Sequence, residues 1–262
     1  MTRPAPRRSG LLVLAYHAIS SSWKDPLAVT PETFRKQLRS LAAAGYRGVT
    51  FSEAATSTST RRRVAVTFDD AFASAAEHAP AVLGELGWPA TVFVPTAPVE
   101  GRQPMRWLGG VDRPRDDDVH LTPMTWAEVE RLTGAGWEVG SHTRTHRRLS
   151  ELPDAEVNEE LERSRQELEE RVGPCRSISY PWGEVSPRVV AAAQRAGYST
   201  GSGLGGRFRF GDPMTVPRVA LAHEDGTLGW RLKTAPAVWL LRSTPVWSGL
   251  EGARTAARRL YR

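Results

Sequence analysis

Cysteine is almost absent from this sequence, since Cys175 is the only one among 262 residues. A single thiol can form neither an intrachain disulfide nor a cluster of thiolate metal ligands, so both are excluded. A chain without disulfides is typical of a reducing compartment. Long apolar runs are missing as well, and no stretch approaches the roughly 20 residues that a membrane-spanning helix needs.

A signal for export is not apparent near the N-terminus either. The pair Arg7-Arg8 is followed by the apolar run Leu11–Ala15, but a signal peptide needs about 7–15 apolar residues and a small-residue cleavage site. The run continues directly into Tyr16-His17, which favours a first β-strand. We therefore expect a cytoplasmic or membrane-peripheral protein.

An excess of charge is missing from most of the chain. The net charge is +6, and residues 231–262 account for all of it with seven basic residues and one acidic residue. The remainder holds 28 of the 35 basic and 28 of the 29 acidic residues, so its charge does not indicate nucleic-acid binding. The basic tail is interpreted either as a terminal helix packed on the domain or as a surface for a membrane or an anionic polymer.

Apolar β-type runs alternate with amphipathic helical stretches along the sequence. The expected strands are 11–16, 48–51, 64–68, 90–94, 137–139, 177–180 and, more weakly, 216–221. The expected helices begin near Pro31, Ala73, Trp126, Asp154 and Pro187 and end close to glycines. This alternation predicts an α/β fold with parallel strands, and over about 220 residues a (β/α) barrel fits better than a small open sheet.

Three parts are expected along the chain: an N-terminal tail at 1–10, a main domain at 11–225 and a basic C-terminal extension at 226–262. Within the domain, residues 96–123 are rich in proline, glycine and charge and lack a regular pattern. Such long segments in compact domains are often functional. This one is expected either to overhang a site or to form a surface insertion.

Polar residues gather where three of the expected strands end. One strand ends in Asp69-Asp70, another is followed by His142 and His146, and a third ends at 180–182. Because the C-terminal ends of parallel strands meet at one rim of a barrel, these groups are expected to lie together. Two histidines and one carboxylate suit zinc or a similar metal. Asp70 would complete that set, and Asp69 would remain as a general base.

Each of these segments also has a plainer interpretation when it is taken alone. Two aspartates after a strand can cap the helix that follows or form a turn, and two histidines four residues apart arise by chance on protein surfaces. If His142 and His146 lie on a helical turn, their spacing places both rings on one side. Finding both segments at strand ends of one barrel favours the metal site.

These segments together resemble the polysaccharide deacetylase family, carbohydrate esterase family four. The first family motif is intact at Thr67–Asp70, the second is His142–His146, and the third, Ser179–Gly183, is similar to the Tyr-Pro-Tyr-Gly branch. The resemblance spans roughly residues 11–221 and implies a distorted (β/α) barrel. It also makes the domain at 11–225 a catalytic one.

The resemblance implies a metal-dependent hydrolase that removes N-acetyl groups from an acetamido sugar, such as N-acetylglucosamine, in a cell-wall polymer or its precursor. It implies that Asp69 is the catalytic base and that Asp70, His142 and His146 are the zinc ligands. It also implies that the main-chain N–H of Trp182 binds the oxyanion. His223, in Leu221-Ala222-His223, would be the general acid, with a solvated loop histidine as the alternative. Contacts with the carbohydrate are expected from His17, Tyr180, Pro181 and Trp107, and His17 is a second candidate for the acid.

The chain departs from the family pattern at Ser179, where some members carry an arginine that pairs with the catalytic carboxylate. The tuning of Asp69 is therefore left open. The glycine-rich run 201–206 matches a dinucleotide-binding pattern only formally, because no helix follows it, and a flexible loop is expected. Two other functions remain open: a carbohydrate O-acetylesterase with the same site, and a carbohydrate-binding protein with a vestigial site.

Overall fold

The computed structural model describes residues 10–109, 115–204, 212–223 and 225–235. The expected tail at 1–10, apart from its last residue, and most of the extension at 226–262 lie outside the described residues. Within the described part, no helix is both long enough and apolar enough to cross a membrane.

The described strands and helices alternate as the sequence predicts. The strands are β1 Leu11–Tyr16, β2 Ala18–Ile19, β3 Ala28–Val29, β4 Arg47–Val49, β5 Arg63–Phe68, β6 Thr91–Val94, β7 Glu138–Ser141, β8 Ser177–Ser179, β9 Thr200–Gly203, β10 Val216–Pro217 and β11 Val219–Ala220. The α-helices are α1 Pro31–Ala43, α2 Phe51–Thr56, α3 Ala73–Leu86, α4 Thr96–Gly101, α5 Trp126–Gly134, α6 Asp154–Val172, α7 Pro187–Arg195 and α8 Thr227–Thr234. Short 3-10 helices occur at Arg106–Gly109, Arg115–Val119, Leu149–Glu151 and Pro181–Gly183.

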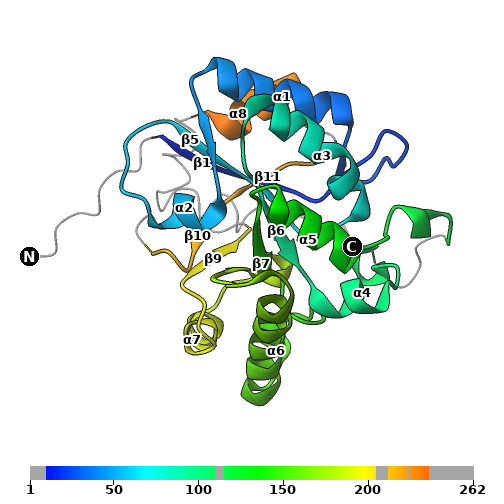
Figure 1. Cartoon of the computed structure of the whole chain (residues 1–262), viewed down its shortest axis with the longest axis vertical. Helices are drawn as coiled ribbons and strands as arrows, with labels where there is room; N and C mark the ends of the chain where they lie inside the picture. Colours follow the sequence, from blue (N-terminus) through cyan, green and yellow to red (C-terminus); the bar gives the residue numbers. More distant parts are fainter. Residues whose placement is uncertain (1–9, 110–114, 205–211, 224, 236–262) are drawn as a thin grey trace, which may run out of the picture.

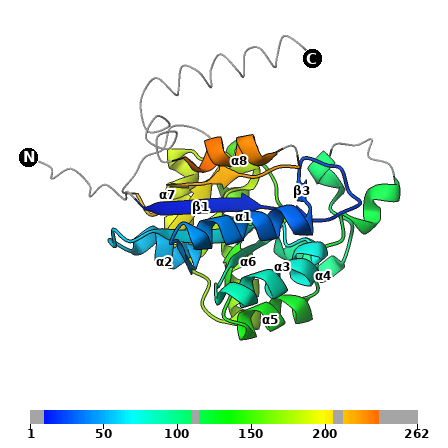
Figure 2. The same ribbon diagram turned by 90° about the horizontal axis from the view of Figure 1, so that it is seen from above.

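The main sheet is a nearly closed, parallel barrel. Its strands follow the order β10-β9-β8-β7-β6-β5-β1-β11, and β4 pairs with β5 beside this path. The two edge strands, β10 and β11, are separated in the chain by Arg218 alone, so one short segment bridges the two ends of the sheet. Helices surround the sheet in both views (Figures 1 and 2). The predicted distorted (β/α) barrel is confirmed.

Side chains of the barrel strands alternate between an outer and an inner environment, as strand geometry requires. In β1, Leu12 and Leu14 belong to the large cluster that packs against the helices, whereas Val13 belongs to a smaller cluster with Phe93 and residues of α2. Phe51 of α2 meets Phe93 edge-on, with ring centroids 5.3 Å apart. The smaller cluster, which contains Val13 and Phe93, is therefore an apolar group around α2. The polar groups of the candidate site occupy other positions along the strands.

Three local expectations are wrong. The strand expected at 48–51 ends at Val49, because Thr50 caps α2 through its side chain. Residues 96–101 form α4 instead of irregular structure. The glycine-rich run expected to be a loop begins as strand β9, and a Cβ at Gly201 would lie 2.6 Å from the main-chain oxygen of Met214. Glycine is needed there because the neighbouring segment packs too closely for a side chain.

Candidate active site

The two aspartates follow β5 directly and are both about 1% exposed. Asp70 and Ala71 adopt left-handed backbone angles, with φ of 66° and 52°, which cost free energy for residues other than glycine and cluster at functional sites. Helix α3 begins only at Ala73, and its N-terminus has no side-chain cap. The plainer interpretation of the aspartates as a helix cap is therefore wrong.

The two histidines follow β7 in a loop that is not a helical turn. Thr143 and His146 have left-handed φ angles of 65° and 60°, so the expectation of one helix face is wrong, although the rings still meet, with centroids 4.7 Å apart. Their Nε2 atoms lie near Asp70 Oδ1, at 3.4 Å from His142 and 3.2 Å from His146. Tight turns after β5 and β7, rather than helical spacing, bring the three side chains together.

A metal ion fits the group formed by Asp70, His142 and His146. One ligand atom from each residue lies within 4.8 Å of the others, and all three residues are buried. Asp70 Oδ1 is buried and has no hydrogen-bond partner within the described part of the chain, which is costly unless a cation satisfies it. His142 Nδ1 lies 2.7 Å from the Ser179 carbonyl oxygen. An N–H there leaves Nε2 with a free lone pair for a metal.

Burial and charge set the protonation of these ligands. Burial raises the pKa of Asp70, but His146 and His142 outweigh this effect and lower it. Burial lowers the pKa of His146 to about 4, so its imidazole is neutral near pH 7. Burial also lowers the pKa of His142, but the carboxylates of Asp69 and Asp70 and the Ser179 carbonyl raise it above its usual value. Below this raised pKa, a metal would have to displace a proton from His142.

Asp69 forms a buried ion pair with an arginine that the sequence did not reveal as a site residue. Arg218 lies between β10 and β11 and is 1% exposed. Its Nη1 is 2.7 Å from Asp69 Oδ1, and its Nη2 is 2.8 Å from Oδ2. The same guanidinium donates to Thr67 Oγ1 at 3.1 Å and to Ser179 Oγ at 2.7 Å. Both oxygens of Asp69 are therefore held in a two-pronged geometry.

Arg218 keeps Asp69 ionised. Burial raises the pKa of this carboxyl group, but Arg218, with His142 adding to it, holds the pKa well below its usual value. Two signals in the sequence pointed weakly to Arg218. It is a lone charge in an apolar β-type run. In addition, Ser179 stands where some family members have an arginine, so a cation that pairs with Asp69 has to come from another position. Only the closure of the barrel places it opposite Asp69.

The two histidines expected as proton donors lie differently. His17, just after β1, is 13% exposed, with its Nε2 4.0 Å from Asp70 Oδ2. Its Nδ1 is buried without a hydrogen-bond partner among the described residues. His223 lies just after β11 and is exposed, and no described contact joins it to the aspartates. The structure thus brings His17 beside Asp70, and the choice of proton donor stays a prediction.

Two tryptophans flank His146. The ring of Trp107 stacks 5.8 Å from the His146 ring, and that of Trp182 lies 5.3 Å away. Trp182 is 39% exposed, has a left-handed φ of 63°, and lies under the guanidinium of Arg148 at 4.2 Å. Trp107 and Trp182 are therefore placed where a sugar ring could stack beside the metal group.

Two of the expected carbohydrate contacts point away from the rim. Tyr180 is fully buried in the main hydrophobic cluster, and Pro181 is also buried. The Tyr180 hydroxyl would lie 2.8 Å from a Cβ at Gly201, so its ring packs against β9 rather than outward. The expectation that these two side chains touch substrate stays a prediction. Their position supports the turn that presents Trp182.

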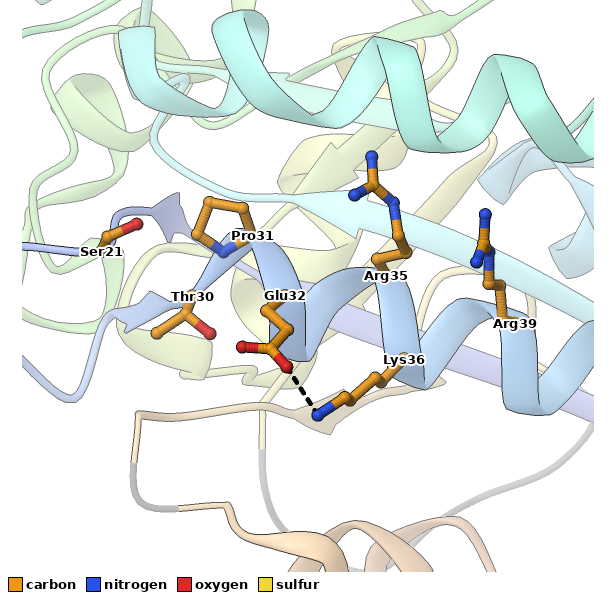
Figure 3. A pocket seen from close by; sticks show the side chains of 7 residues that line it. All are labelled: Ser21, Thr30, Pro31, Glu32, Arg35, Lys36 and Arg39. Carbon is orange, nitrogen blue, oxygen red and sulfur yellow. Dashed lines mark ion pairs between the residues drawn. The ribbon is translucent and has the colours of Figure 1, made fainter.

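A hollow of about 600 Å³ lies along the first turns of α1, apart from the metal group, and is shown in Figure 3. It is lined by Ser21, Thr30, Pro31, Glu32, Arg35, Lys36 and Arg39. Lys36 pairs with Glu32 at 2.7 Å, and both arginines pair with Glu85, at 3.5 and 3.0 Å. These cations are exposed and already paired, and none belongs to the metal group.

Comparisons with known proteins place this site in context. A sequence model of the polysaccharide deacetylase family matches residues 56–201. The Bacillus subtilis (strain 168) protein YxkH is 25% identical over 197 residues, covering 73% of this chain and 63% of YxkH. The chain thus spans less than two thirds of that relative.

Solved structures share the barrel. IcaB from Ammonifex degensii is 25% identical with a TM-score of 0.67, over 90% of this chain and 97% of that chain. The Bacillus anthracis protein BA0330 is 23% identical with a TM-score of 0.68, over 85% of this chain and 68% of that chain. These likenesses agree with the fold described above.

Proposed function

Because the chain belongs to the polysaccharide deacetylase family, we propose that it removes N-acetyl groups from an acetamido sugar in a polysaccharide or its precursor. The observation that carries the proposal is the buried set of Asp70, His142 and His146, gathered within 4.8 Å at the end of the strand that also presents Asp69. N-acetylglucosamine units of a cell-wall polymer are the substrate that we propose. The catalytic unit that we propose is 11–225.

The three ligands would hold a divalent cation, for which we propose zinc. Such a cation, when bound, polarises an acetyl carbonyl and lowers the pKa of a water molecule. Asp70 offers a carboxylate oxygen free of hydrogen bonds, and each histidine offers Nε2. The Ser179 carbonyl fixes the ring of His142, which supports a preorganised site.

Asp69 would act as the general base, because it is ionised and adjacent to the metal group. Arg218 donates to both carboxylate oxygens, and Ser179 Oγ also donates to Oδ2 at 3.3 Å, which leaves Oδ1 with a second lone-pair direction to accept a proton from water. The ion pair fixes the orientation of the carboxylate, which is what proton transfer at a defined distance requires. Arg218 thus takes the part that the resemblance gives to an arginine at position 179.

The leaving amine needs a proton, and the developing oxyanion needs a donor. We assign the proton to His17, since its ring faces Asp70, and keep His223 as the alternative that the resemblance implies. The main-chain N–H of Trp182 is the donor that we propose for the oxyanion. Trp107 and Trp182, which flank His146, would stack on the sugar.

Acetate release from N-acetylglucosamine oligomers tests the proposal. The zinc-loaded protein should release acetate and generate free amines, and Asp69→Asn should do neither at a comparable rate. Acetylated xylan serves as the competing substrate. Faster release from xylan would instead assign the site to O-acetyl esters, and no release from either substrate, with zinc bound, would leave a binding protein.

A further inference from the structure

We propose that Glu160 of α6 is a positioning residue for the metal group. It holds the loop 142–146 in the conformation that directs both imidazoles at Asp70. The proposal rests on the function proposed above only in taking this group as a metal site. Glu160 is buried, at 6% exposure, and has no part in the chemistry described so far.

The loop needs an external support because its backbone is strained. Thr143 and His146 both have φ near +60°, a region that residues other than glycine uncommonly adopt and that is a clear outlier for a β-branched residue such as Thr143. Each such residue costs roughly 1–3 kcal/mol and persists only where surrounding contacts fix it. The loop also contains no glycine between His142 and His146 that would reduce this cost.

Glu160 supplies three of those contacts. Its Oε2 accepts the main-chain N–H of Arg144 at 3.0 Å and that of Thr145 at 2.8 Å. Its Oε1 accepts the hydroxyl of Thr145. No described cation forms an ion pair with it, so the loop itself compensates a buried carboxylate. Successive N–H groups that converge on one anion are a known way to do so.

The other contacts support the front of the loop. Ser164, one turn further along α6, lies 2.7 Å from Ser141 Oγ, which accepts the N–H of Thr143 at 3.0 Å. From the other side, the N–H of Ala97 in α4 donates to the Arg144 carbonyl at 2.9 Å. Among the described residues outside the loop, only Glu160 hydrogen-bonds Thr145, which immediately precedes His146. Its loss should therefore free the second histidine more than the first.

Glu167 provides a matched comparison on the same helix. It accepts from the side chain of Arg144 at 3.2 Å and from the hydroxyl of Thr96. It accepts no main-chain N–H of the loop among the described hydrogen bonds. A substitution at Glu167 removes a carboxylate of the same helix close to the same loop, yet it leaves the backbone support of His146 intact.

The experiment measures binding of Zn²⁺ and Co²⁺ to the apoprotein by competition with a chelator, together with the visible spectrum of the Co²⁺ form. Glu160→Met, which preserves side-chain length without the carboxylate, should weaken binding about 10–100-fold and alter the spectrum. Glu160→Gln should restore wild-type behaviour, because its amide oxygen can accept both N–H groups. Glu167→Met should bind as the wild type does.

Each outcome decides the proposal. Wild-type affinity and spectrum in Glu160→Met would overturn it, as would a Glu167→Met variant that is weakened equally. If Glu160→Met does not fold, Thr145→Val, which removes only the hydroxyl contact, takes its place: weaker binding with the same spectral change supports the proposal, and unchanged binding overturns it. A wild-type protein that binds neither ion overturns both this proposal and the metal site. Metal binding without acetate release would defeat the proposed function alone.

Discussion

Asp69 and Asp70 are adjacent, equally buried and equally charged, yet their surroundings are opposite. Asp69 faces a permanent cation, Arg218, which satisfies both of its oxygens. Asp70 faces His142 and His146, whose imidazoles can be neutral, and its Oδ1 has no hydrogen-bond partner among the described residues. The left-handed backbone at Asp70 lets two neighbouring carboxylates face such different partners.

The different partners of Asp69 and Asp70 show how one short segment can supply two chemical roles. A fixed cation keeps a carboxylate ionised and oriented, whatever else binds nearby. Two imidazoles instead leave a carboxylate oxygen available to a metal, because neutral imidazole is itself a ligand. The partner of each aspartate, and not its own position in the sequence, therefore determines its role.

Exchanging each carboxylate for an amide should separate the two roles most clearly. Asp69→Asn should lower kcat by about 10²–10⁴-fold, because an amide cannot accept the proton, while zinc still binds. Asp70→Asn should lose activity through loss of zinc binding. Acetate assays and chelator competition on both variants measure this. Equal loss of zinc in the two variants would contradict the division of roles.

Removing the cation should reveal how strongly Asp69 depends on it. Arg218→Met leaves a buried carboxylate without its partner, which should cost about 3–5 kcal/mol of unfolding free energy near pH 7. Urea denaturation of the apoprotein measures this value. Asp69→Asn combined with Arg218→Met should recover much of it, because no unpaired charge is then buried. If the double variant is no more stable than Arg218→Met, the pair is not the cause.

The pH dependence of this cost has a definite sign. In the wild type the folded pKa of Asp69 lies below its unfolded value of about 3.9. Its contribution is therefore complete above that value and is lost as pH falls through the folded pKa. In Arg218→Met, burial dominates and raises the pKa of Asp69. The loss of unfolding free energy caused by Arg218→Met should therefore become smaller as pH falls from 7 toward 4. A loss that does not change with pH would argue against a buried charge.

The two candidate proton donors differ in their distance from Asp70, and this predicts unequal effects. His17→Ala should lower kcat by about 10²-fold, in the range for general acid catalysis. His223→Ala should leave kcat unchanged, because His223 is exposed and has no described contact with the site. Steady-state acetate release measures both. The reverse order would return the acid role to His223.

Zinc binding should weaken in acid because His142 keeps a proton to a higher pH than a free histidine does. Its pKa is raised above 6.5 by the two aspartates and the Ser179 carbonyl, so below that pKa zinc must displace one proton. The apparent affinity should then fall about tenfold per pH unit. Chelator competition between pH 8 and 5.5 measures the slope. An affinity independent of pH across this range would show that His142 is already neutral.

Much of the fold followed from local signals in the sequence. Gly87 and Gly173 marked the ends of α3 and α6, and the strand ends before Asp69 and His142 indicated a common rim. The geometry of the histidine loop could not be predicted from the sequence, because its left-handed residues are Thr143 and His146, and no glycine marks these positions. The four-residue spacing suggested a helical turn, whereas contacts from α4 and α6 impose another shape.

Arg218 shows why part of the site could not be predicted. It is 149 residues from Asp69 in the chain, and its position depends on the barrel closing between β10 and β11. No local pattern encodes that pairing, and the departure at Ser179 revealed only that something was missing. The orientation of Tyr180 could not be predicted for a related reason, since only the packing of β9 shows that its ring points inward.

The smallest expected effect concerns the rim beside the metal group. Trp182→Ala should raise KM for N-acetylglucosamine oligomers about fivefold, which corresponds to roughly 1 kcal/mol of lost stacking. The value of kcat should change little, because the main-chain N–H remains. Trp126→Ala is a matched control, since Arg171 lies over its ring at 5.4 Å as Arg148 lies over Trp182. Of these two tryptophans, only Trp182 has a described ring contact with His146. An equal change in KM for both variants would therefore show that the loss of a cation-covered ring, and not stacking on the sugar, is responsible.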